Sequence, residues 1–139
     1  MTALVLDASV ALSWCFDNEA TEAGDRLLEQ LTEENAAVPS IWPLEVANIL
    51  ALSERRNRIT SARTAQFVAL LETLSISVDE ETSAHALGRV LNLARAQRLT
   101  AYDAAYLELA MRLGVPLASK DRDLCDAAER VGIAVVRAG

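Results

Sequence analysis

The sequence has few of the residues that build disulfide frameworks, thiolate metal sites or catalytic triads. Its 139 residues include two cysteines and one histidine. Cys15 and Cys125 form no C-x-x-C pair and each lies in an apolar helical pattern, so we expect two buried free thiols. His85 lies alone in the middle of a predicted helix, with no serine or cysteine motif nearby. This pattern argues against nucleophilic catalysis by a Ser-His or Cys-His pair.

Long apolar runs and glycine-rich loops are also missing. Hydrophobic residues make up 52% of the chain, yet no uninterrupted stretch approaches the roughly 20 residues of a membrane span. Met1–Asp7 carries no basic segment and reaches a carboxylate too early for a signal peptide, so we expect a cytoplasmic protein. Without a glycine-rich phosphate loop, the sequence gives no support to nucleotide-cofactor binding.

Positive charge is scarce, and almost all of it is arginine. The formal net charge is −7 and Lys120 is the only lysine. This balance argues against nucleic-acid binding through a broad positive surface, because neutralising phosphates needs clustered cations. Arg55, Arg56 and Arg58 nevertheless lie close together in the sequence. They indicate either a local phosphate-binding patch or a solvated helix end whose cations face the last carbonyl groups.

Short apolar segments alternate with helical patterns along the chain. Strands are predicted at Ala3–Leu6, Ala36–Val38, Ser75–Val78, Pro116–Ser119 and Ala134–Val136. Helices are predicted at Ala8–Phe16, Glu19–Glu34, Ser40–Arg56, Thr60–Thr73, Thr82–Arg98, Thr100–Leu113 and Asp121–Val131. Short apolar strands separated by helices indicate a parallel sheet with helices on both faces. We therefore predict an α/β fold, a three-layer α/β/α sandwich with a mostly parallel sheet, in a single domain that spans residues 1–139.

Four acidic residues occupy comparable places in this predicted fold. Asp7 ends the first strand and Asp121 lies just past the fourth, while Glu45 and Asp103 lie in the first turns of helices. In a parallel α/β sheet, ligands bind outside the carboxyl ends of the strands, so we expect these side chains to converge in one cleft. Taken alone, Asp103 is better explained as a capping acid, because Thr100 is a suitable N-cap three residues earlier.

Converging carboxylates need a cation. They repel one another by about 1 to 4 kcal/mol per pair, and they either stay partly protonated or bind a metal ion. Oxygen ligands without histidine or thiolate favour Mg²⁺ or Mn²⁺ over zinc. Such ions are normally completed by phosphate oxygens of a substrate, and they activate water and neutralise the charge that develops on phosphorus. The acids therefore point to hydrolysis of a phosphate ester.

Four short motifs occur in the order and spacing of a known family. They are Leu6–Val10, Glu45–Asn48, Tyr102–Tyr106 and Leu117–Asp121. Together they resemble the PIN-domain ribonucleases, in particular VapC-type toxins. The resemblance implies that the four acids are the metal-binding positions and that Ser9 and Ser119 are supporting hydroxyls. It also implies Mg²⁺- or Mn²⁺-dependent cleavage of RNA, a homodimer, and a cognate VapB-type antitoxin that covers or enters the cleft.

Several assignments stay open within this interpretation. Asp123 competes with Asp121 as the fourth acid; Asp121 is preferred because it is nearer to the strand end. Asn48, one turn after Glu45, is equally compatible with a hydrogen bond to a metal ligand and with a plain surface amide. The three arginines at positions 55, 56 and 58 are expected to line the RNA path or the antitoxin interface.

Two other classes of function compete with a nuclease. A receiver-type phosphoacceptor domain is also a doubly wound α/β fold with carboxylates at strand ends, and Ser119 and Lys120 would suit it. That class needs paired acids after the first strand, however, and here Asp7 is followed by Ala8 and Ser9. A non-catalytic interaction domain, in which the acids serve only as helix caps, is the other alternative.

Overall fold

Five short strands form one parallel sheet in the order β3-β2-β1-β4-β5. The computed structural model describes residues 1–139. The strands are β1 (Thr2–Leu6), β2 (Asn35–Val38), β3 (Ile76–Val78), β4 (Leu117–Ser119) and β5 (Val135–Arg137). All five lie within about two residues of the predicted segments, because each is a short apolar run bounded by polar or turn residues.

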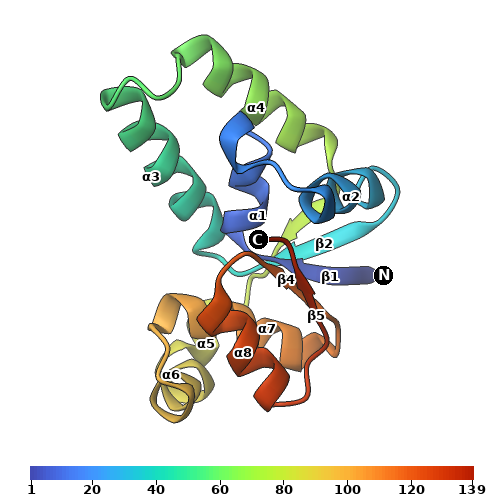
Figure 1. Cartoon of the computed structure of the whole chain (residues 1–139). Helices are drawn as coiled ribbons and strands as arrows, with labels where there is room; N and C mark the ends of the chain where they lie inside the picture. The colour runs from blue at the N-terminus through green and yellow to red at the C-terminus, as the bar shows by residue number, and fades with distance from the viewer.

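Helices cover both faces of the sheet (Figure 1). One layer contains α1 (Ala8–Ser13), α2 (Glu22–Gln30), α3 (Trp42–Arg55) and α4 (Ser61–Thr73). The other contains α5 (Thr82–His85), α6 (Leu91–Gln97), α7 (Ala101–Leu113) and α8 (Arg122–Arg130). In Figure 1, α3 and α4 form a helical hairpin that extends away from the sheet. The predicted three-layer α/β/α architecture is confirmed.

The central strand and helix α7 hold the core. Leu4, Val5 and Leu6 of β1 are at most 2% exposed, because this strand has a neighbour on each side and helices on both faces. Residues 104–110 of α7 are buried as well. Burial of this kind supplies most of the stability of a parallel sheet, and it gives α7 a fixed position beneath β1.

The chain reverses its direction of winding between β1 and β4. It passes from β1 through β2 to β3 on one side, then returns to β4 on the other side of β1. The amide of Asp7 donates to the carbonyl of Ala118 at 3.0 Å, so the carboxyl ends of these two strands lie together. This is the topological switch point, where open α/β sheets bind ligands. The order also differs from the 2-1-3-4-5 order of receiver-type domains, which excludes that alternative.

Three helices differ from their predicted bounds. Helix α1 stops at Ser13, and α2 starts at Glu22, where Thr21 is the N-cap and accepts from the amide of Gly24. The predicted helix at residues 82–98 is divided by a π-helical segment at Ala86–Val90, which contains Gly88. Glycine is a weak helix former, and it permits this local widening. No helix is long and apolar enough to cross a membrane.

Candidate active site

Asp7 lies at the end of β1, and its side chain is held by two serines. The Oγ atoms of Ser9 and Ser119 each donate to Asp7 Oδ2 at 2.7 Å. Asp7 has the N-cap position of α1 without a side-chain capping hydrogen bond, although a backbone hydrogen bond from the adjacent Ala8 helps to lower its pKa. The two serines are the side chains that hold its carboxylate. Burial raises the pKa of Asp7, the two serine hydrogen bonds oppose that rise, and the negative charge of Asp121 adds to it.

The two serines also join the ends of strands β1 and β4. Ser9 Oγ accepts from the amide of Lys120 at 3.1 Å, and Ser119 Oγ accepts from the amide of Asp121 at 2.9 Å. Asp121 is the N-cap of α8, where its Oδ1 accepts from the amide of Leu124 at 2.9 Å. This network fixes Asp7 and Asp121 on neighbouring strand ends. Both serines thus have the supporting geometry that the motifs implied.

Glu45 lies in the first turn of α3 and is bonded to α7. The hydroxyl of Tyr106 donates to Glu45 Oε1 at 2.5 Å. Burial raises the pKa of Glu45, the Tyr106 hydrogen bond counters this, and the charge of Asp7 contributes a further rise. Tyr106 is fully buried, and burial together with the charges of Asp7 and Glu45 raises the pKa of its hydroxyl, so it remains a donor.

Asp103 combines a capping role for its backbone with a free carboxylate. Its amide donates to Thr100 Oγ1 at 3.1 Å, so Thr100 is the N-cap, as predicted. No side-chain or backbone donor is bonded to the Asp103 carboxylate, so the reciprocal half of a capping box is absent. Burial, followed by the charges of Asp121, Asp7, Glu45 and Asp123, raises the pKa of Asp103 to about 6. Capping alone does not account for a carboxylate in this environment.

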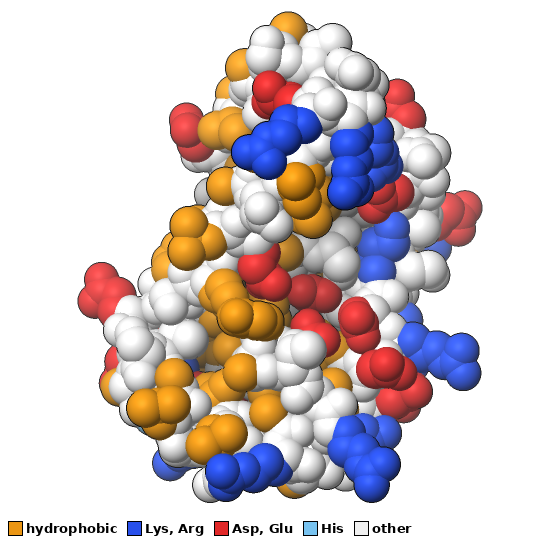
Figure 2. Space-filling model, turned by 90° about the vertical axis from the view of Figure 1, so that its left-hand side faces the viewer, with side chains coloured by type: hydrophobic (Ala, Val, Ile, Leu, Met, Phe, Trp, Pro, Cys, Tyr) orange, Lys and Arg blue, Asp and Glu red, His pale blue; other side chains and the backbone are white.

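The four predicted acids therefore face one region at the carboxyl edge of the sheet. Each of the three anchored acids has one oxygen bonded to a protein donor and one without such a bond: Asp7, Glu45 and Asp121. Figure 2 views this side of the molecule and shows acidic side chains grouped in a hollow at its centre. No three histidine, cysteine or acidic side chains lie close enough together to hold one ion directly. Mg²⁺ commonly takes only one or two carboxylates and keeps several waters, so the donor set suits it.

Other predicted residues lie outside this cluster. Asn48 is exposed on α3 and makes no side-chain hydrogen bond. Asp123 is exposed in the first turn of α8, and its charge raises the pKa of Asp103 less than that of Asp121 does. Of the two candidates for the fourth acid, Asp121 therefore interacts more strongly with Asp103 than Asp123 does.

The arginines lie at the tip of the α3–α4 hairpin. Arg55, Arg56 and Arg58 are all exposed. The guanidinium of Arg58 lies 4.6 Å from the centre of the Phe16 ring and 3.3 Å from the carboxylate of Glu19. It also lines a cavity of about 530 Å³ beside the end of α1. In Figure 2, basic side chains occupy the upper part of the face whose centre is acidic.

An apolar pocket lies at the start of α7, the helix that carries Asp103. It has a volume of about 320 Å³ and is formed by the start of α3, the start of α7 and the segment from α5 to α6. Tyr102, next to Asp103 in the chain, is 60% exposed at this pocket, and Leu87 is 89% exposed. Figure 2 shows hydrophobic side chains beside the acidic hollow. Exposed apolar surface of this kind is typical of protein interfaces.

Tyr106 is only the last residue of the Tyr102–Tyr106 motif in the sequence, with no role predicted for it at the site. In the structure its hydroxyl is bonded to Glu45, 61 positions away in sequence. The available signal was its spacing from Asp103, since residues three apart on a helix share a face. Lys120 was considered only for a receiver. Its ammonium group donates to the carbonyl of Glu19 at 3.1 Å and thereby ties the end of β4 to the segment after α1.

Comparison with known proteins matches the chain to one family of proteins. The PIN domain family matches residues 4–130. Ribonuclease VapC3 from Pyrobaculum aerophilum is 28% identical over 123 residues, which cover 88% of this chain and 92% of that protein. The crystal structure of PAE2754 from the same organism has a TM-score of 0.71 at 23% identity and covers 97% of this chain and 84% of that one. VapBC2 from Rickettsia felis, solved bound to a DNA fragment from their promoter, has a TM-score of 0.68 at 13% identity and covers 96% and 97% of the two chains.

Proposed function

Because the chain belongs to the PIN domain family, as its four motifs predicted, we propose that it is a divalent-metal-dependent endoribonuclease of the VapC type. One observation carries the proposal. Four carboxylates from separate parts of the chain interact electrostatically at the topological switch point of the sheet. A fold does not retain repelling, partly buried acids for stability, so their role is in binding a cation.

The residues present fit Mg²⁺ or Mn²⁺. The donors are all hard carboxylate oxygens, with no histidine among them, and both cysteines are buried free thiols, of which Cys125 donates to the carbonyl of Ser119. Asp7, Glu45, Asp103 and Asp121 are the residues that would hold the metal, whether one ion or two. When bound, the metal supplies a lowered pKa for water and neutralises charge at the phosphorus.

The protein's own groups prepare this site in three ways. Ser9 and Ser119 fix one oxygen of Asp7 and leave the other free. Tyr106 does the same for Glu45. Asp103, whose carboxylate has no protein donor, is ionised at neutral pH, because its pKa of about 6 lies below 7. Together these contacts orient negative oxygens toward the place where an RNA phosphodiester and its attacking water would bind.

RNA binding is proposed to extend from the acids toward the tip of the α3–α4 hairpin. Arg55, Arg56 and Arg58 are exposed there, and guanidinium groups suit phosphates. The chain's net charge of −7 means that this local patch has to carry most of the attraction for RNA. Because an enzyme of this type acts on cellular RNA, we propose that it works in the cytoplasm.

The partner proposed for the apolar face is a VapB-type antitoxin. The similar structure of VapBC2 from R. felis contains promoter DNA, which supports a role in a toxin–antitoxin pair. The pocket includes Tyr102, the chain neighbour of Asp103, and we propose that an apolar segment that enters it also obstructs access to the acids. We further propose that residues 1–139 form a single PIN-like domain and that two copies of the chain form a homodimer. Light scattering of the purified protein would test the homodimer.

The test of the nuclease proposal is RNA cleavage by a matched set of acid-to-amide variants. Wild-type protein is expected to cleave single-stranded RNA in the presence of Mg²⁺ or Mn²⁺ and not after chelation. Asp103→Asn and Asp121→Asn should lose at least about a hundredfold in rate, since even groups that only support a metal ligand cost 10- to 100-fold. Asp123→Asn serves as the control, because Asp123 is an exposed acid in the first turn of α8, the helix that Asp121 caps.

Each outcome of that experiment has a clear interpretation. Loss in Asp103→Asn and Asp121→Asn with full activity in Asp123→Asn supports the proposal and assigns the fourth acid. Loss in Asp123→Asn but not in Asp121→Asn reverses that assignment. If the wild-type protein binds RNA or an antitoxin but cleaves no RNA with either metal, the chain is a non-catalytic interaction domain and the proposal is wrong.

A further inference from the structure

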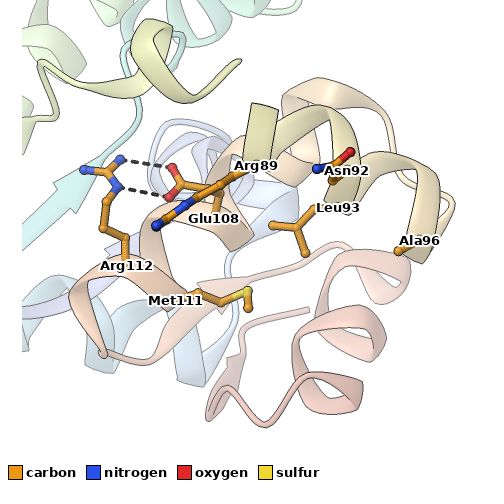
Figure 3. A pocket seen from close by; sticks show the side chains of 7 residues that line it. All are labelled: Arg89, Asn92, Leu93, Ala96, Glu108, Met111 and Arg112. Atoms are coloured by element: carbon orange, nitrogen blue, oxygen red, sulfur yellow. Dashed lines mark hydrogen bonds and ion pairs between the residues drawn. The ribbon is translucent and has the colours of Figure 1, made fainter. Parts of the chain in front are cut away.

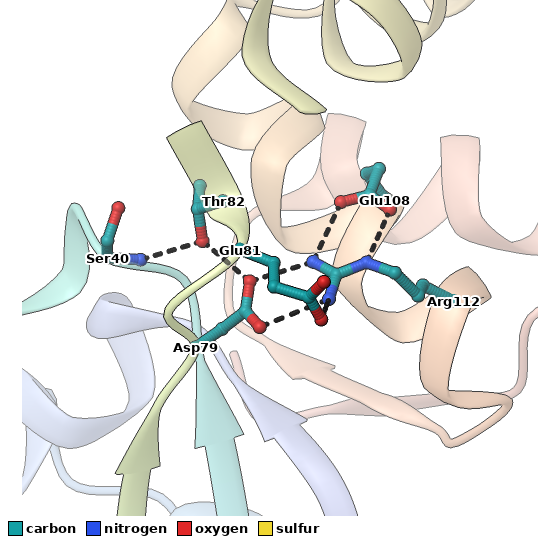
Figure 4. Close-up of polar contacts among 6 residues, drawn as sticks. All are labelled: Ser40, Asp79, Glu81, Thr82, Glu108 and Arg112. Atoms are coloured by element: carbon teal, nitrogen blue, oxygen red, sulfur yellow. Dashed lines mark hydrogen bonds and ion pairs between the residues drawn. The ribbon is translucent and has the colours of Figure 1, made fainter. Parts of the chain in front are cut away.

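Arg112, near the end of α7, holds two carboxylates at once (Figure 4). Its Nε and one terminal nitrogen donate to the two oxygens of Glu108 at 3.0 and 3.1 Å. Its two terminal nitrogens donate to the two oxygens of Asp79 at 3.1 and 2.7 Å. Bidentate pairs of this kind fix orientation as well as distance. Arg112 thereby joins α7 to the turn between β3 and α5.

The contact continues from that turn to the start of α3. The hydroxyl of Thr82 donates to Asp79 Oδ2 at 2.9 Å and accepts from the amide of Ser40 at 3.0 Å. Ser40 lies between β2 and α3, five residues before Glu45. We call the set Arg112, Glu108, Asp79, Thr82 and Ser40 the Arg112 clamp. It provides a second attachment between the helices that carry Glu45 and Asp103, in addition to the Tyr106 hydrogen bond.

The clamp depends on its single cation. The Glu108 side chain is 3% exposed, that of Asp79 is 12% exposed, and Glu81 lies 3.6 Å from the same guanidinium. Hydrogen bonds from Arg112 lower the pKa of Asp79. Glu108 and Arg112 also line a cavity of about 510 Å³ between α6 and α7 (Figure 3). Arg89 also lines this cavity, but the ion pair of Glu108 is made with Arg112.

We propose that the Arg112 clamp orients the metal site, with Arg112 and Thr82 as its positioning residues. Helices α3 and α7 supply Glu45 and Asp103 from their first turns, so any tilt of α3 against α7 changes the separation of these two carboxylates. The apolar face of α3 is packed in the core, and the Tyr106 hydrogen bond is its polar contact with α7 at Glu45. The clamp adds a second set of polar contacts just before α3 begins. This inference rests on the proposed function, because it assigns the purpose of the clamp to the metal site.

The experiment breaks the clamp without exposing a buried charge. Thr82→Val removes the hydroxyl that joins Asp79 to Ser40 and leaves both Arg112 pairs intact. Thr73→Val is the matched control, since the Thr73 hydroxyl donates only to a backbone carbonyl of its own exposed helix. Calorimetric titration of the metal-free proteins with Mn²⁺ is the first readout. The second is the separate measurement of kcat and KM for RNA cleavage, and the third is the melting temperature.

Thr82→Val is expected to weaken Mn²⁺ binding about tenfold and to lower kcat by a similar factor with KM for RNA little changed. Thr73→Val should match the wild type. A lower melting temperature with unchanged Mn²⁺ affinity and kcat would show a purely structural clamp and overturn the inference. If the wild type cleaves no RNA but Thr82→Val still weakens Mn²⁺ binding, the clamp stands and the proposed ribonuclease activity fails.

A second variant keeps the test decisive if Thr82→Val does not fold. Arg112→Lys preserves the positive charge but cannot make two bidentate pairs at once. It is expected to lower Mn²⁺ affinity in the same direction, whereas Arg26→Lys, on an exposed pair with Glu22, should leave it unchanged. Equal Mn²⁺ affinities for Arg112→Lys and the wild type would overturn the inference.

Discussion

Tyr106→Phe removes one oxygen atom from the site and nothing else. The hydroxyl of Tyr106 donates to Glu45 Oε1, and a backbone hydrogen bond from Ala8 also acts on it. A hydrogen bond to a charged group contributes about 1.5 to 3 kcal/mol. Because Glu45 is only partly buried, water can replace part of this contact. We therefore expect the free energy of unfolding to fall by about 1.5 kcal/mol, the lower end of that range.

This loss has a measurable counterpart in melting temperature and in metal binding. For a domain of this length, 1.5 kcal/mol corresponds to roughly 4 to 8 °C. The Tyr106 hydrogen bond holds down the pKa of Glu45 against burial and the charge of Asp7. Its removal should raise the pKa of Glu45 further, so that Mn²⁺ binding requires a higher pH. At neutral pH the Mn²⁺ affinity should fall about tenfold.

Tyr102→Phe is the matched control on the same helix. Its ring is 60% exposed and its hydroxyl makes no hydrogen bond within the protein. Chemical denaturation and differential scanning calorimetry of the metal-free proteins measure the first effect. Calorimetric Mn²⁺ titrations between about pH 6 and about pH 8, roughly one unit on each side of neutrality, measure the second. If Tyr106→Phe behaves like Tyr102→Phe in both assays, the assigned role of Tyr106 is wrong.

Three further predictions concern charge. Asp103→Asn should stabilise the metal-free protein at neutral pH by up to about 3 kcal/mol in denaturant unfolding, because the pKa of Asp103 is raised from 3.8 to about 6. A variant no more stable than the wild type would contradict the unfavourable burial and charge repulsion assigned to Asp103. The pKa of Asp103 is higher in the folded than in the unfolded protein, so its contribution to stability falls as pH rises from about 4 to about 6. The stability gained by Asp103→Asn should therefore nearly vanish in unfolding experiments at about pH 4 and be constant above about pH 7. Replacing Arg55, Arg56 and Arg58 by serine should weaken binding of single-stranded RNA and reduce the slope of the logarithm of the binding constant against the logarithm of salt concentration by up to about 2. Fluorescence anisotropy measures the slope, with Arg26→Ser as the control. An unchanged slope would show that these arginines do not contact the RNA.

The strands and the acids were predictable because both depend on local sequence. Short apolar runs locate the strands, and a parallel sheet brings their carboxyl ends to one edge, so Asp7 and Asp121 could be placed before the structure was known. Glu45 and Asp103 followed from their positions in the first turns of helices. The three-layer architecture followed from the alternation of strands and helices.

The remaining features depend on contacts between distant parts of the chain. Helix α1 ends at Ser13, and just beyond it the carbonyls of Trp14 and Cys15 accept hydrogen bonds from Arg63 on α4. The Tyr106 bond and the Arg112 clamp likewise join residues that no local pattern connects. Such pairings are set by how helices pack on the sheet, which hydrophobic periodicity does not specify.

The most direct test of the account is the position of Mn²⁺ in crystals of this protein. Anomalous diffraction from crystals soaked in Mn²⁺ should give a peak in contact with a carboxylate oxygen of Asp7 or Asp103, at the carboxyl ends of β1 and β4. Asp103→Asn crystals treated in the same way should lose or weaken that peak. An ion bound elsewhere, or no ion at these carboxylates at a Mn²⁺ concentration that supports RNA cleavage, would contradict the assignment of the four acids as the metal site.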